Sequence, residues 1–153
     1  MASQREELSL EKQMSNIQEE ARMILPGIQA LFGFQLIAVF QEKFSKLPEF
    51  EKHIHLAATT LTLTGILLLI APAAYHRITE PHSVTDKLVK RSTLLITIGL
   101  FPLAVALSLD FYLFTRIVLE SAQVAAIFGG IAFVALVITW FIWPKSQVQR
   151  SGS

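Results

Sequence analysis

Four long apolar stretches dominate the pattern of this chain. They cover residues 24–40, 54–75, 92–109 and 121–143, and none of them contains Asp, Glu, Lys or Arg. A helix needs about 20 residues to cross the roughly 30 Å hydrocarbon core of a bilayer. The pattern therefore predicts an all-α integral membrane protein, a four-helix bundle with spans at about 24–44, 54–76, 91–113 and 121–143.

The segment before the first span has a helical pattern of its own. Its apolar residues recur at steps of three and four and continue into the span without a change of phase: Leu10, Met14, Ile17, Ala21, Ile24, Ile28 and Leu31. We therefore expect one amphipathic helix over 1–23 that is continuous with the first span, with Pro26 and Gly27 as a kink or hinge. Because the segment is acidic overall, we expect it to dock on the 77–91 loop or a neighbouring subunit rather than on anionic lipid.

Basic residues are distributed unequally between the two ends of the predicted spans. One side carries Arg5, Lys12, Arg22, Arg77, Lys87, Lys90, Arg91, Lys145 and Arg150, whereas the other carries only Lys43, Lys46, Lys52 and Arg116. The positive-inside rule then places both termini in the cytoplasm, including a tail at 144–153. Pro81 and His82 mark the expected turn between spans two and three.

Composition excludes several classes of function. Charged residues make up 16% of the chain and hydrophobic ones 52%, and 13 basic residues nearly balance 12 acidic ones, so no nucleic-acid partner is expected. The chain has no cysteine. Nothing resembles a nucleophile elbow, a phosphate loop or a zinc motif, so we expect no enzyme, no cofactor and no metal site.

Polar residues inside the spans are the candidates for a polar path or gate. Asp110 is the only carboxylate in an apolar setting, which favours a proton or cation site; the alternative is a structural Asp near the outer interface that pairs with Lys43 or Lys46. Glutamines and threonines can line such a path or simply bond between helices and to the backbone. The candidates are Gln29, Gln35, Thr59, Thr62 and Asp110.

His53 and His55 form an H-x-H pair, but a helix places positions two apart on different faces, so both cannot bind one metal there. Glu51 lies four residues before His55, and this spacing predicts an ordinary surface pair between them.

Two further sequence features mark helix ends and helix contacts. Pro72, Tyr75, His76 and Arg77 form an interfacial hinge at the end of span two, where His76 and Arg77 either anchor the helix or belong to a gate. In span four, small residues recur every fourth position, a spacing that lets helices approach closely. They are Ala122, Ala126 and Gly130, with Ala125 and Gly129 in a parallel row.

The stretches "EEARMILPGIQALFGFQL" and "LLLIAPAAYHRI" resemble a family of small bacterial four-span membrane proteins, DUF6328, a domain of unknown function. The likeness covers roughly residues 19–91. Some relatives carry a label as sodium:proton antiporters. The resemblance implies a bacterial inner-membrane protein and singles out an entry motif, Glu20, Arg22, Pro26 and Gly27, together with Gln29, Phe32, Phe34 and the hinge residues.

Two hypotheses for the function remain after these observations. The first is a small homo-oligomeric ion channel or transport protein, with a pore between subunits and an ion or proton as its cargo. The second is a non-transporting scaffold or regulatory protein that acts through its N-terminal helix. Four spans leave little room for an aqueous path inside one chain.

Overall fold

The computed structural model describes residues 2–79 and 84–151. It is 93% helical, and the part it describes contains no strand, which confirms the all-α prediction. The main helices are α1 (Ala2–Ala38), α3 (Glu49–Thr79), α4 (Asp86–Leu119) and α5 (Ala122–Val137). The shorter elements are α2 (Glu42–Ser45), the π-helical turn η1 (Ile138–Ile142) and α6 (Trp143–Ser151).

Four helical segments of the described chain are long and apolar enough to cross a membrane, as predicted. They are Ser9–Ala38, Glu49–Thr79, Asp86–Leu119 and Ala122–Gln147. The first helix ends before the expected residue 44, because turn-type hydrogen bonds from the backbone N–H groups of Phe40 and Gln41 close it. The turn expected at Pro81 and His82 lies outside the described residues.

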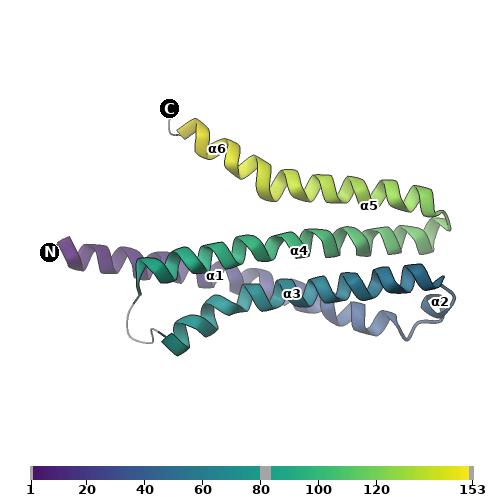
Figure 1. Ribbon diagram of the computed structural model, residues 1–153, viewed down its shortest axis with the longest axis horizontal. Coiled ribbons are helices and arrows are strands. Elements are labelled where there is room, and N and C mark those ends of the chain that lie inside the picture. Colours follow the sequence, from purple (N-terminus) through teal and green to yellow (C-terminus); the bar gives the residue numbers. More distant parts are fainter. Residues whose placement is uncertain (1, 80–83, 152–153) are drawn as a thin grey trace.

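The helices pack around an antiparallel pair formed by α3 and α4 (Figure 1). Helix α1 contacts both members of this pair. The extensive contacts that α5 makes with another long helix are with α4. The bundle is thus a three-helix core with a fourth helix on its edge. The N-terminus and α6 lie at the end of the molecule where α3 finishes, here called the 76–91 end; α2 lies at the other, the 39–48 end (Figure 1).

Two glycines allow the close approach of α3 and α4. A Cβ atom built on Gly65 would lie 2.5 Å from Cγ of Leu103, and one built on Gly99 would lie 3.1 Å from Cβ of Leu68. Both glycines are buried. The absence of a side chain at these positions therefore sets the distance between the two helices.

We expect Gly65→Val to lower the free energy of unfolding by about 1–3 kcal/mol, because the added atoms would overlap Leu103. The unfolding midpoint in detergent, followed by circular dichroism, measures this effect. Gly33→Val is the matched control, since a Cβ at that helical glycine meets nothing within 4 Å. Equal midpoints for the two variants would contradict the close approach at Gly65.

The N-terminal half of α1 docks on the start of α4. Met14 is 2% exposed and packs with Leu88 and Val89, and Leu10 and Ile17 cover the same contact. The helix passes through Pro26 without a break, so the predicted single helix is observed. The apolar stripe thus finds its partner within the chain, on two residues of the 77–91 segment that belong to the start of α4.

Candidate functional site

Three polar side chains from three different helices meet inside the packed core. The side-chain amide Nε2 of Gln35 on α1 donates to Oδ2 of Asp110 on α4 at 2.7 Å and to Oγ1 of Thr62 on α3 at 3.1 Å. Gln35 is 4% exposed and Thr62 is fully buried. Three of the five predicted path candidates therefore form one polar cluster, whose members lie far apart in sequence.

His55 is the fourth member of this cluster. Its Nε2 lies 2.9 Å from the main-chain oxygen of Gln35, and because a carbonyl can only accept, Nε2 carries the proton. The ring is 7% exposed and meets the ring of Phe44 edge-on, with the centroids 4.9 Å apart. The cluster therefore contains two groups that can exchange protons, His55 and Asp110.

The predicted surface pair between Glu51 and His55 is wrong. Glu51 instead accepts a hydrogen bond from Nε of Arg116 on α4 at 3.2 Å, and its side chain is 7% exposed. Sequence spacing alone allowed the pair with His55 but did not show that this face of α3 packs against α4. The ion pair lies one helical turn from His55, towards the 39–48 end.

Lysines do not pair with Asp110 in the described part of the chain. Lys46 binds Glu42 in its own helical turn, at 2.5 Å. The structural alternative for Asp110, a partnership with Lys43 or Lys46, is therefore replaced by the bond from Gln35. The buried amide of Gln35 donates to Asp110, whereas the exposed ammonium groups of Lys43 and Lys46 do not.

A cavity of about 320 Å³ adjoins the cluster at the 39–48 end. Gln35, His55 and Asp110 line one part of it, and Phe44 and Leu47 from the segment around α2 line another. The side-chain oxygen Oε1 of Gln35 is buried and has no hydrogen-bond partner among the described residues. An acceptor in this position can receive a proton donor or a small cation.

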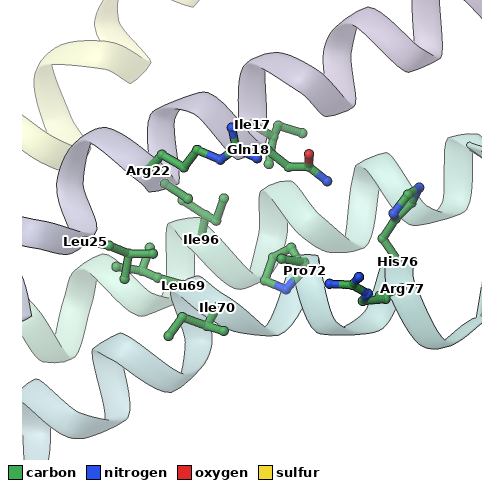
Figure 2. Close-up of a pocket in the computed structure, with 12 residues that line it drawn as sticks. Ile17, Gln18, Arg22, Leu25, Leu69, Ile70, Pro72, His76, Arg77 and Ile96 are labelled. Atoms are coloured by element: carbon green, nitrogen blue, oxygen red, sulfur yellow. The ribbon is translucent and has the colours of Figure 1, made fainter. Parts of the chain in front are cut away.

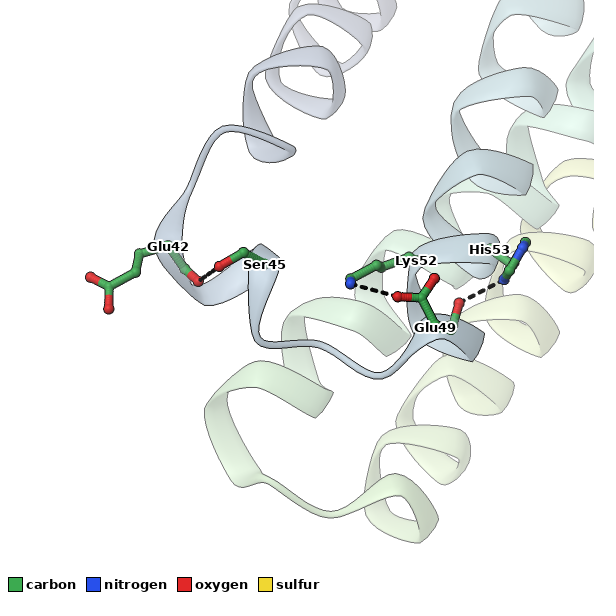
Figure 3. A network of polar contacts seen from close by, with 5 residues as sticks. All are labelled: Glu42, Ser45, Glu49, Lys52 and His53. Carbon is green, nitrogen blue, oxygen red and sulfur yellow. Dashed lines mark hydrogen bonds and ion pairs between the residues drawn. The ribbon is translucent and has the colours of Figure 1, made fainter.

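Short-range polar contacts occur in α2 and in the first turn of α3, at the same end of the molecule as the cavity (Figure 3). The hydroxyl of Ser45 donates to the main-chain oxygen of Glu42, and Lys52 binds Glu49 at 2.8 Å. His53 is exposed, and its Nδ1 donates to the main-chain oxygen of Glu49. His53 and His55 therefore belong to different surroundings, and the described residues contain no group of three side chains suited to a metal.

The other two path candidates stay outside the polar cluster. Gln29 is exposed on α1. The hydroxyl of Thr59 donates to the main-chain oxygen of His55, four residues earlier. This is the local backbone bond that was expected as the alternative to a path.

The hinge residues separate into two groups. Pro72 is buried within α3, and the hydroxyl of Tyr75 accepts a hydrogen bond from Arg91 at the start of α4. His76 and Arg77, together with Pro72, line a second cavity, which they share with Arg22 of the entry motif.

The remaining entry and packing residues are largely exposed. Glu20, Pro26 and Gly27 are exposed on α1. In α5 the parallel row of Ala125 and Gly129 is buried, and a Cβ on Gly129 would lie 3.0 Å from Cβ of Tyr112. The predicted row of Ala122, Ala126 and Gly130 is exposed and borders a groove lined by α3, α4 and α5.

The sequence analysis missed His55 as part of the site, although a signal was present. Glu51, His55, Ala58 and Thr62 follow one another at steps of four, three and four, and all are buried on one face of α3. This spacing places three polar side chains on a single helical stripe. Such a stripe inside an apolar helix indicates a polar surface that faces other helices.

A family model matches most of the chain. The model of a family described as "Family of unknown function (DUF6328)" matches residues 3–144. No curated protein and no solved structure matches the chain.

Proposed function

We propose that this chain, which belongs to the DUF6328 family of unknown function, is a membrane transport protein that takes up and releases a proton at Asp110. The observation that supports the proposal is the Gln35–His55–Thr62–Asp110 cluster, which joins three membrane-length helices. An ionisable side chain within such helices is costly and marks an ion or proton pathway by default.

The hydrogen bonds of Gln35 allow two arrangements of the site. As a carboxylate, Asp110 accepts from Nε2 of Gln35, and the amide oxygen Oε1 is left without a partner. When Asp110 is protonated, its carboxyl group becomes a hydrogen-bond donor. A flip of the Gln35 side-chain amide, which exchanges the positions of Nε2 and Oε1, then lets Oε1 accept this hydrogen bond. Proton uptake would thus exchange one hydrogen-bonding pattern for another without moving a helix.

The route to the site would pass through the adjoining cavity. His55 and Asp110 both line this cavity, and His55 also contacts Phe44 there. The imidazole of His55 would be the second proton-carrying group on this route. On the positive-inside rule the 39–48 end faces away from the cytoplasm. Protons would then reach Asp110 from the outer side of a bacterial inner membrane, and both termini would be cytoplasmic.

A homo-oligomer is part of the same proposal. Gln29 is exposed on α1 at membrane depth, where an amide facing lipid is unfavourable. Contact with a second copy of the chain would give Gln29 a hydrogen-bond partner between helices.

The scaffold hypothesis is less well supported. A scaffold that works through the N-terminal helix needs an apolar face for its partner, and Met14 and its neighbours already pack against Leu88 and Val89. Between residues 9 and 22, every exposed side chain of α1 is polar or charged, and both acidic and basic groups occur among them.

Gln35→Leu and Gln29→Leu form a matched pair of variants for testing the proposal. In proteoliposomes with a pH gradient and an internal pH dye, we expect Gln35→Leu to lower proton flux at least about tenfold, because one good hydrogen bond to a charged group contributes about 1.5–3 kcal/mol. Gln29→Leu makes the same chemical change on an exposed face of the same helix and should keep most of the flux.

The opposite result would place the path elsewhere. Loss of flux in Gln29→Leu with normal flux in Gln35→Leu would favour a pore between subunits. No flux of protons, Na⁺ or K⁺ through the wild type under any gradient would remove the transport proposal.

A further inference from the structure

A second hollow lies at the 76–91 end, away from the polar cluster. It has a volume of about 520 Å³ and is bounded by α1, α3 and α4. Figure 2 shows Gln18 and Arg22 on α1 across from Pro72, His76 and Arg77 on α3. Arg22 of the entry motif and three residues of the hinge, Pro72, His76 and Arg77, therefore line the same hollow.

The polar side of this hollow is positively charged. Arg22 and Arg77 come from different helices, and neither forms an ion pair or hydrogen bond with any side chain that the structure describes. His76 and Gln18 add further possible donors. Glu19 and Glu20 precede Arg22 and are exposed, as the two arginines are, but neither glutamate lines the hollow.

The other side of the hollow is apolar. Leu25, Leu69 and Ile70 line it, together with Pro72 (Figure 2). Along α1, Arg22 precedes Leu25, and along α3, Arg77 follows Leu69 and Ile70. Each arginine therefore lies nearer the 76–91 end than the apolar residues of its own helix (Figure 1). The lining therefore changes from cationic to apolar along the direction of the helices.

We propose that this hollow binds the phosphate-bearing headgroup of an anionic phospholipid, with the upper part of an acyl chain along Leu25 and Ile70. A guanidinium group binds phosphate through two parallel N–H donors, and basic pockets between membrane helices are suited to acidic headgroups. A free phosphate would use only the arginine side. The apolar wall favours the lipid over the soluble ion.

Binding of phosphatidylglycerol to the delipidated full-length protein tests this proposal by native mass spectrometry. We expect one retained lipid per chain, and binding about tenfold weaker in the double variant Arg22→Gln/Arg77→Gln. Lys12→Gln/Lys87→Gln is the matched control, because it removes two exposed charges from the same end without touching the hollow. It should bind phosphatidylglycerol like the wild type.

Three further measurements decide between the alternatives. Phosphatidylcholine should bind more weakly than phosphatidylglycerol, and inorganic phosphate at millimolar concentration should not displace the lipid. Ala73→Phe fills the hollow without a change of charge and should also weaken binding, which keeps the test valid if the arginine variant does not fold.

Equal losses of phosphatidylglycerol binding in the arginine and lysine double variants would overturn the proposal. They would indicate only a general attraction between the basic end of the protein and the anionic lipid. Displacement of the lipid by inorganic phosphate would do so too, since the site would then be one for a soluble anion. None of these outcomes depends on proton transport.

Discussion

Replacing Asp110 by Asn should reduce pH-gradient-driven proton flux to the level of protein-free liposomes. Asn has nearly the same shape and still accepts a hydrogen bond from Gln35, but it cannot take up or release a proton. Proteoliposomes with an internal pH dye provide the measurement, with circular dichroism to show that the helices remain.

Two controls separate the chemistry of Asp110 from a general loss of negative charge. Asp86→Asn removes an exposed carboxylate that pairs with Lys90 and should leave the flux unchanged. Asp110→Glu keeps a protonatable group and should restore part of the flux. Wild-type flux in Asp110→Asn would exclude this carboxyl group as the proton site.

Arg116→Met should lower the free energy of unfolding by about 3 kcal/mol, because it leaves the buried carboxylate of Glu51 without its partner. The double variant Glu51→Leu/Arg116→Met should recover much of this loss, since it removes both charges. Unfolding midpoints in detergent measure both effects.

Lys90→Met is the control for this ion pair. Its pair with Asp86 is exposed, and loss of such a pair costs about 0–1 kcal/mol. If Arg116→Met were no more harmful than Lys90→Met, the Glu51–Arg116 contact would have no special role in stability.

The helical spans could be predicted from sequence because apolar length alone decides whether a helix can cross a bilayer. The long α1 was predictable for a related reason, since the phase of its apolar stripe continues from Leu10 to Leu31. Both inferences depend on local pattern. Neither requires knowledge of which helices are neighbours.

The site was only partly predictable because it depends on how helix faces meet. Gln35, Thr62 and Asp110 were each identifiable as polar residues in apolar surroundings, but their meeting depends on the contacts of α1, α3 and α4. At the level of sequence, His55 has a partner one helical turn away in Glu51. Its actual contact with the main-chain oxygen of Gln35 depends on burial between helices, which is a property of the assembled bundle.

The same limit applies to α5. Two rows of small residues run along it at the same spacing, one through Ala125 and Gly129 and the other through Ala126 and Gly130. Only the first packs on α4. Small residues at every fourth position identify a helix face that is suited to close contact. When two adjacent rows have this spacing, the sequence alone does not tell which row faces the partner helix.

The unbroken course of α1 ties the contact at Met14 to the orientation of Gln35. An α-helix turns about 100° per residue, so a slip of one residue at the contact with Leu88 and Val89 would turn the Gln35 side chain away from Thr62 and Asp110. The N-terminal segment therefore sets the rotational register of a side chain about 30 Å away along the same helix. The docking of this segment on α4 therefore fixes which face of α1 is turned towards α3 and α4.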